Sequence, residues 1–309
     1  MAWVLDAPSG VYKDHALSAK IREAAIADAQ FMRFVRPEGN FGKGRGQSIS
    51  ITRVFPLPKA TRISELDRLP SGRPAIDTLD ISVSEWGFKI PMTEFEKNLT
   101  HFDLTNQFQR VLRDQMRLTM DDMVATAFKS TPIKYTPQDS GAGVFSTNGV
   151  AGATADANLS VDDLRAIHDE LRALKVPKFR NGKYVGILST KAARGIKNDD
   201  EYKDWQAPTT SGPFLDARLR DVEGFMLIET NHEDALSDSL GTNGVLGEAV
   251  FFGADPVVLA TVDEPELRAG FPEDLGRFRD VGWVGTLEAG LVWENADYAR
   301  AIHVTSDDS

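Results

Sequence analysis

The sequence predicts an α+β protein, and three patterns in its 309 residues support this prediction. Residues 48–55 and 78–90 alternate apolar and polar side chains, as half-buried β-strands do. Residues 104–128 instead repeat apolar side chains at helical spacing. The segment 160–262 mixes both patterns, and the chain from residue 276 onward is β-like again. Outside residues 160–262, helical and strand patterns therefore occupy separate stretches of the sequence, which is typical of the α+β class.

The first predicted element is an amphipathic helix over residues 16–35, where Leu17, Ile21 and Phe31 recur at helical spacing. The glycine-rich segment 41–47 follows it. Its glycine spacing fits neither of the phosphate-binding loop patterns, so we expect a hinge there and no phosphate site.

The two alternating segments predict a long hairpin. In the second segment the apolar phase slips at Glu85, which indicates a bend beside Gly87, and an unbroken strand over 78–90 would span roughly 40 Å. Residues 56–77 lie between the strands and contain four prolines and seven charged residues, too polar a composition for a core. An isolated hairpin is marginally stable in water, so we expect another subunit to complete it.

The longest helical pattern follows Asp103, a predicted N-cap, and should span about 40 Å. We interpret its methionine-bearing apolar stripe as core packing, since this is commoner than a cofactor groove. The neighbouring Asp121 and Asp122 have no acidic residue three or four positions away, so we do not expect a carboxylate pair for catalysis.

Residues 131–159 look like a loop, and the mixed α/β unit follows. Ser160 and Asp163 have capping-box spacing and predict a helix start. Residues 184–188 predict a strand that leads into Ser189 and Thr190, which we interpret as helix caps and not as a ligand-binding turn. Further strands are predicted at the following segments: 224–231, 248–253 and 256–262.

The last region is predicted as β-structure, because apolar side chains alternate with small or polar ones from Val281 to Trp293. The sequence "ADY" at 296–298 then turns the chain into a final strand that contains His303.

Composition excludes several classes of protein. The chain is 41% hydrophobic, carries a formal charge of −11 and has no cysteine. It therefore has no disulfides or thiolate ligands, and a protein devoted to binding free nucleic acid would be basic. No stretch approaches the roughly 20 apolar residues of a membrane helix.

No catalytic, cofactor-binding or metal site is predicted. The histidines are too far apart for known zinc motifs, although folding could bring them together: His15, His101, His168, His232 and His303. We expect His168 at the edge of its helix's apolar stripe. The acidic segments 198–204 and 263–266 lack the calcium-loop frame, so we interpret both as solvated loops.

Four longer stretches, in their order and spacing, resemble the major capsid proteins of tailed bacteriophages, which have the Hong Kong 97 fold. These are "GKYVGILSTKAARGI" from residue 182, "LRDVEGFMLIET" from 219, "FFGADPVVLA" from 251 and "GRFRDVGWVGTLEAGLVWENADYARAIHV" from 276. The resemblance extends over nearly the whole chain.

The resemblance implies five regions. Residues 1–47 would form an N-terminal arm, 48–95 an extended loop, 96–159 a peripheral domain with a spine helix, 160–276 an axial domain, and 277–309 the closing strands of the peripheral domain. It implies no enzyme activity and no cofactor. One relative cross-links its subunits through a lysine and an asparagine. Lys59 lies on the extended loop, but nothing identifies a partner for it, so we do not expect this cross-link here.

The same resemblance implies a protein that forms homo-pentamers and homo-hexamers in an icosahedral virion shell. This shell would be assembled in the bacterial cytoplasm and would enclose double-stranded DNA that a motor drives in. The expected partners are a separate scaffolding protein (unless the chain is already processed), a portal and possible decoration proteins, with only weak contact to DNA and none to membranes. Two alternatives remain open: an encapsulin-like compartment, which would hold cargo enzyme, and a soluble α/β enzyme, which would need a well-formed polar pocket.

Overall fold

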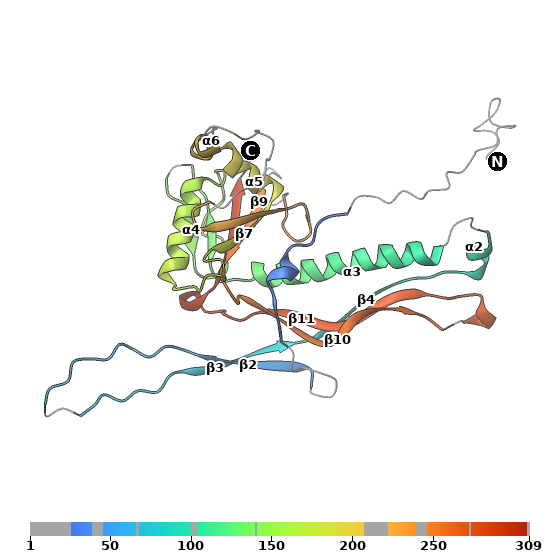
Figure 1. The fold of residues 1–309 in the computed structure, drawn as a ribbon, viewed down its shortest axis with the longest axis horizontal. Coiled ribbons are helices and arrows are strands. Elements are labelled where there is room, and N and C mark those ends of the chain that lie inside the picture. The colour runs from blue at the N-terminus through green and yellow to red at the C-terminus, as the bar shows by residue number, and fades with distance from the viewer. Residues whose placement is uncertain are drawn as a thin grey trace.

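The computed structural model describes residues 26–38, 46–65, 68–99, 104–139, 141–206, 222–238, 246–271 and 273–307. These form a six-stranded sheet with helices, a four-stranded sheet under one long helix, and a projecting hairpin (Figure 1). Within these ranges, no helix is long and apolar enough to cross a membrane.

The six-stranded sheet is the centre of the larger unit and has the order β6-β5-β12-β9-β7-β8. Its strands are β5 (Lys134–Thr136), β6 (Val144–Ser146), β7 (Tyr184–Ser189), β8 (Phe225–Thr230), β9 (Leu246–Phe252) and β12 (Ala301–Asp307). Every residue of β7 is buried, because both faces of this sheet are covered.

Two helices pack on one face of this sheet, α4 (Val161–Ala173) and α5 (Thr190–Asn198). The short helix α6 (Asp200–Gln206) follows α5. The other face is covered by the end of the long helix α3 and by the 3-10 helix η1 (Phe31–Phe34), which place Phe128 and Phe31 against Phe252 and its neighbours. The sheet is therefore the middle layer of a three-layer unit.

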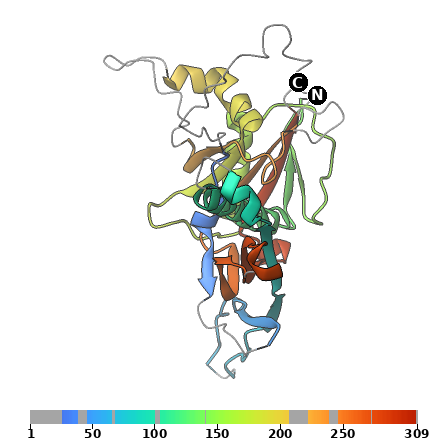
Figure 2. The same cartoon turned by 90° about the vertical axis from the view of Figure 1, so that its right-hand side faces the viewer.

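The four-stranded sheet has the order β1-β10-β11-β4 and extends away from this unit (Figures 1 and 2). Its strands are β1 (Arg36–Glu38), β4 (Ser84–Ile90), β10 (Val257–Ala269) and β11 (Val281–Leu291). A 3-10 turn, η2 (Asp274–Gly276), lies between β10 and β11, and the short helix α2 (Glu94–Leu99) follows β4.

Helix α3 (Leu104–Lys129) lies along one face of the four-stranded sheet. Its 26 residues span about 39 Å, which confirms the predicted long helix. Its apolar stripe packs Leu112 and Met116 against Val281 and Trp283, and the indole N–H of Trp283 donates to Gln115 Oε1 at 2.7 Å. The methionine stripe is therefore part of a core, as predicted.

The chain crosses between the two sheets three times, first from β4 to β5 through α3. Strand β9 belongs to the six-stranded sheet, β10 and β11 pair in the four-stranded sheet, and β12 returns after the 3-10 turn η3 (Ala296–Tyr298) to lie between β5 and β9. The interpretation of residues 256–262 as part of the α/β unit is therefore wrong, and β12 does not join the other closing strands. Strand partners far along the chain decide the sheet, and local alternation does not encode them.

The hairpin is a separate two-stranded sheet of β2 (Ser48–Val54) and β3 (Ile76–Ser82), which confirms the predicted pairing. The prediction of one unbroken strand over 78–90 is wrong, because residues 84–90 leave the hairpin and pair with β11 instead. The predicted phase slip marks this change: Leu79 and Ile81 face the body beside Ala260, whereas Trp86 belongs to the clusters beneath α3.

The predicted N-terminal helix is also wrong over its described part; residues 16–25 lie outside the described residues. Residues 26–30 are irregular, and only the single turn η1 follows. The backbone N–H groups of Gln30 and Met32 donate to the carboxylate of Asp121, 3.2 and 3.0 Å away, instead of to helical carbonyls. A buried charge on α3 thus outweighs local helix propensity.

Two smaller differences concern loops. Residues 131–159 contain the short strands β5 and β6, so this region is not wholly loop. The acidic segments are not loops either, because 263–266 lies within β10 and residues 200–204 lie in α6, where Glu201 pairs with Arg165. The pairing of β10 with β11 shifts register at this segment, between Thr261 and Asp263 and between Asp263 and Glu266, so the strand continues through its charged residues.

Candidate assembly site at the base of the projecting hairpin

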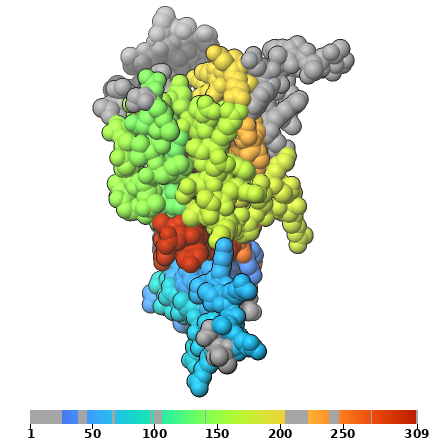
Figure 3. All heavy atoms as spheres, turned by 90° about the vertical axis from the view of Figure 1, so that its left-hand side faces the viewer, coloured from blue at the N-terminus to red at the C-terminus, as the bar shows by residue number. Residues whose placement is uncertain are grey.

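The tip of the hairpin has no core of its own. Every described residue from Pro56 to Thr78 is exposed, and this includes Leu57, Leu69 and Lys59. Leu69 leaves 79% of its surface in water. In Figure 3 the hairpin, coloured blue, forms a narrow projection beneath the rest of the molecule. Exposed apolar side chains on such a projection mark a surface that contacts another molecule.

Arg53 fastens the base of the hairpin to the body. Its side chain is 9% exposed although it lies on a two-stranded sheet. One guanidinium nitrogen donates to the carbonyl of Val292 at 2.9 Å, and the other pairs with Asp77 at 2.5 Å. The residue shares a strand face with Ile49 and Ile51, and all three alternate inward toward the body.

Aromatic side chains surround the same base. Phe55 contacts Tyr298 and Trp293, with ring centres 4.9 and 6.4 Å apart. The guanidinium of Arg300 lies 4.5 Å from the centre of the Trp293 ring, a cation–π contact. Burial lowers the pKa of Arg300, and its Nη1 donates to the carbonyl of Ala254 at 3.1 Å. The segment after β11 thereby connects hairpin and body.

Close packing completes the attachment. Ile81 of β3 presses on Gly290 of β11, where an added Cβ atom would lie 2.4 Å from the Ile81 Cδ1 atom. A side chain at position 290 would therefore push the hairpin away from the sheet, and glycine permits the approach.

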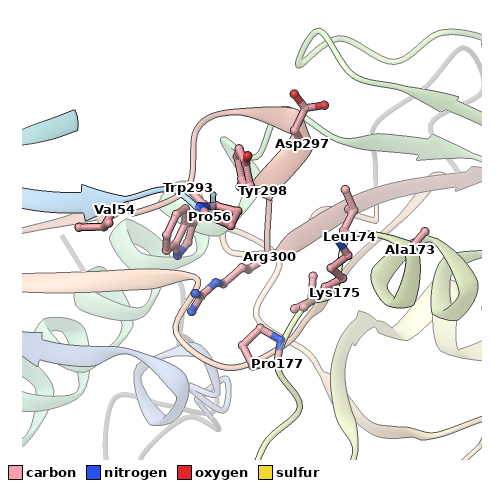
Figure 4. A pocket seen from close by; sticks show the side chains of 11 residues that line it. Val54, Pro56, Ala173, Leu174, Lys175, Pro177, Trp293, Asp297, Tyr298 and Arg300 are labelled. Carbon is pink, nitrogen blue, oxygen red and sulfur yellow. The ribbon is translucent and has the colours of Figure 1, made fainter. Parts of the chain in front are cut away.

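Two open hollows flank this neck. One, of about 340 Å³, lies between Val54 and Pro56 of the hairpin, Leu174 and Lys175 beyond α4, and Trp293 (Figure 4). The second, of about 390 Å³, lies on the side of Ser50, Thr52 and Arg36, and Trp293 and Arg300 line both. The hairpin therefore contacts the body through a narrow, aromatic neck.

Ser189 is the N-cap of α5, as predicted, whereas Thr190 is the first residue of that helix and not a cap. Ser189 is 1% exposed, and its hydroxyl accepts the N–H of Ala192 at 3.4 Å. Asp238 adds a second cap by accepting the N–H of Lys191 at 3.1 Å. The Ser189 hydroxyl is thus buried and caps the backbone of its own helix.

The three histidines in the described residues do not form one site. His15 and His101 lie outside the described residues, as do residues 41–45 of the predicted hinge. His168 is half-buried at the edge of α4, as predicted, with 23% of its side chain exposed. His232 lies beside Asp121, and His303 beside Glu248. In the described part of the chain, no cluster of three or more His, Cys, Asp or Glu residues could hold a metal ion.

Sequence reasoning missed two buried acidic residues. Asp121 is completely buried and binds residues 30–32, with His232 Nδ1 3.5 Å from its carboxylate. Glu248 is 3% exposed; its carboxylate lies 3.2 Å from His303 Nε2 and accepts the N–H of Ser237 at 2.8 Å. Their partners lie far along the chain, so no local spacing signals either residue. Asp121 and Asp122 do not form a catalytic pair, because Asp121 is occupied by backbone groups.

Known proteins were compared with the chain in three ways. A family model described as phage capsid protein matches residues 76–304, more than half of the chain. No curated protein matches. Among solved structures, the chain is similar to the capsid asymmetric unit of cyanophage Pam1, with 13% identity, a TM-score of 0.77, and 96% of this chain and 97% of that chain covered.

Two further capsids give the same result. For the head of Helicobacter pylori bacteriophage KHP40 the identity is 15% and the TM-score 0.72, with 97% of this chain and 98% of that chain covered. For the capsid of Ralstonia phage GP4 the values are 12% and 0.70, with 98% and 97% covered. Because these three structures are only 12–15% identical to the chain, they show its fold alone. The match to the phage capsid family is what shows the function.

The described geometry agrees with the comparisons. The hairpin is anchored at its base and exposed at its tip, and the described residues contain no cluster that could hold a metal ion. The comparisons do not support the two alternatives, an encapsulin-like compartment and a soluble α/β enzyme. The chain belongs to the phage capsid protein family: it is a structural major capsid protein with the Hong Kong 97 fold, which assembles with its own copies into the virion shell and is not an enzyme.

Proposed function

We propose that this capsid protein forms pentamers and hexamers that close an icosahedral shell around double-stranded DNA, and that the hairpin joins neighbouring copies. The observation that carries the proposal is the exposed hairpin tip, 56–65 and 68–75, on a neck held by Arg53. The base of the hairpin is fixed and its tip has no core of its own, as expected of a hairpin whose tip packs against a second copy.

The charges of the tip favour a contact of matched polarity. Arg62, Glu65, Arg68 and Arg73 are all exposed, and burying them in a subunit interface requires opposite charges from the neighbour. Each such contact is weak, but the many copies in a shell make the sum large.

We also propose how the regions of the chain correspond to the domains of the fold. The six-stranded sheet with α4 and α5 is the axial domain, and the four-stranded sheet with α3 is the peripheral domain. Residues 1–47 are the N-terminal arm, which adds β1 to the edge of the four-stranded sheet, and 48–83 are the extended loop. This division differs from the one expected from sequence, because it follows sheet membership and assigns β10 to the peripheral domain and β12 to the axial domain.

The proposal includes the partners that the capsid family implies: a scaffolding protein, a portal and possible decoration proteins, with assembly in the host cytoplasm and only weak, non-specific contact with DNA. No catalytic, cofactor or metal site is part of it. Co-purification with candidate proteins from infected cells tests each partner separately.

The experiment for the main proposal is to measure the size of the purified full chain by sedimentation and electron microscopy. We expect closed shells, or rings of five and six copies, over a range of salt and with a scaffolding protein present. A compact monomer under every one of these conditions would contradict the proposal.

A further inference from the structure

Helix α3 carries a row of arginines on the side that faces away from its sheet. Arg110, Arg113 and Arg117 are three and four positions apart, and all three are exposed. This spacing places them on one side of the helix, along about 10 Å of its axis. Gln115, which accepts a hydrogen bond from Trp283 of the sheet, lies on the opposite side, and Leu112 packs on the sheet beside it. We call Arg110, Arg113 and Arg117 the arginine stripe.

The charge of this surface is opposite to that of the whole chain. The chain carries a formal charge of −11, whereas residues 104–120 hold three arginines and one acidic residue, Asp114. A polyanion would be repelled by most of such a molecule and attracted only where cations gather. The arginine stripe is such a place.

Exposure keeps the arginine stripe accessible to a ligand, although Arg110 and Arg117 both have interaction partners within the chain. Arg117 pairs with Asp28 at 3.4 Å, but the two side chains are 53% and 57% exposed, and exposed pairs of this kind are weak. The polar residues Asn106 and Gln109 lie along the same part of the helix. Arginine and amide side chains are typical contacts to phosphate oxygens.

We propose that the arginine stripe faces the inside of the shell and binds the phosphate backbone of packaged DNA. This inference rests on the proposed function, because only a DNA-filled shell supplies the ligand. A protein partner is less favoured, because Val111 is the one large apolar side chain of α3 that is strongly exposed in the described residues, at 54%, and protein interfaces need apolar anchors.

The hairpin and α3 lie on opposite sides of the four-stranded sheet (Figures 1 and 2). The stripe is thus well separated from the proposed contact between copies, and one subunit can use both surfaces at once. Three phosphate contacts per copy give weak, salt-sensitive binding, which many copies multiply.

The experiment is a titration of the full chain, as monomers or capsomers, with a short fluorescent DNA duplex between about 50 and 200 mM salt. For the triple variant R110Q/R113Q/R117Q we expect the slope of log affinity against log salt to decrease by about 3, one for each lost phosphate contact. The triple variant R110K/R113K/R117K keeps the charge and should keep nearly the wild-type slope.

The matched control is R268Q/R277Q/R279Q, which removes three exposed arginines from the far end of the four-stranded sheet. It should bind DNA like the wild type. An equal loss in the control, or no loss in the stripe variant, overturns the inference. Two further results would overturn the inference, because they would indicate a protein partner. One is a stripe variant that binds DNA normally but no longer assembles. The other is polyglutamate that competes for the arginine stripe more strongly than DNA of equal charge does.

A second measurement tests which side the stripe faces. Arginines in DNA-filled and emptied particles are modified with phenylglyoxal and mapped by mass spectrometry. We expect Arg110, Arg113 and Arg117 to be protected only in filled particles, and equal modification in both would overturn the inference. A wild type that forms no particles contradicts the proposed function instead, while the titration still decides whether the stripe binds DNA.

Discussion

Asp121 connects the N-terminal segment to α3 through a buried hydrogen bond from the N–H of Gln30 and a partly buried one from the N–H of Met32. In Asp121→Asn the side-chain amide would face one of these donors, which would then lack an acceptor inside the protein. We expect the free energy of unfolding of the unassembled chain to decrease by about 1 to 3 kcal/mol, measured by urea denaturation.

The neighbouring residue supplies the control. Burial raises the pKa of Asp122, so its charge is not favoured where it lies, and Asp122→Asn should lose less than about 1 kcal/mol. Equal losses for the two variants would show that the effect belongs to this turn of α3 and not to the hydrogen bonds of Asp121.

Glu248 and His303 make stability depend on pH. Burial lowers the pKa of His303. Burial alone would raise the pKa of Glu248, but hydrogen bonds from His303 and the Ser237 N–H, with the charge of Lys129, outweigh it, and the pKa lies below its usual value. Below about pH 6.5 the unfolded His303 binds a proton that the folded residue does not, so acid favours unfolding. The stability from Glu248 is present above its ordinary pKa and is lost at still lower pH, as its folded carboxylate becomes protonated.

We therefore expect the melting temperature to fall as the pH is lowered from about 7 to about 5, and His303→Gln to flatten this decrease. Only the slope is compared, since the substitution also changes packing. His168→Gln, at a half-buried site, is the control and should keep the wild-type slope. An unchanged slope in His303→Gln would refute the role of this pair.

At the scale of the element, α5 begins at two caps, and the loss of one should be tolerated. Ser189→Ala removes the acceptor for the N–H of Ala192 while Asp238 still caps Lys191. We expect a loss of about 0.5 to 2 kcal/mol of stability by thermal or chemical unfolding, with normal particle yield. Thr190→Ala should cost no more than this. A folded Ser189→Ala protein that lost a specific ligand or a turnover reaction would contradict the structural role.

At the scale of the whole molecule, the hairpin tip should matter for assembly and not for folding. Replacing residues 56–74 by an Asn-Gly turn keeps the hydrogen bond from Phe55 N–H to the Ala75 carbonyl, 3.0 Å long, and the neck around Arg53. We expect unchanged circular dichroism and thermal melting, because every described residue among those removed is exposed, and a loss of shells in electron microscopy. Normal shells would refute the contact between copies, and a globally unfolded chain would show that the tip stabilises its own subunit.

The sequence predicted those parts of the fold that neighbouring residues determine. The capping box of Ser160 and Asp163 forms as expected, and the alternation in 48–55 gives a strand with one face inward. It failed where distant groups compete, as when Asp121 binds the backbone near Phe31 and prevents a helix. The inward position of Arg53 could have been predicted from the sequence. Side chains alternate between the two faces of a strand, so Arg53 lies on the same face as Ile49 and Ile51, toward the body.

The position of β12 has a consequence for synthesis. This strand lies in the interior of the six-stranded sheet, between β5 and β9, and all three are far apart along the chain. A ribosome releases residues 301–307 only after the rest of that sheet, so in a nascent chain β5 can pair with β6 and β9 with β7, but the position between β5 and β9 stays empty. Chains whose translation stops early therefore cannot complete this layer, and the growing particle receives only subunits that were read through to β12.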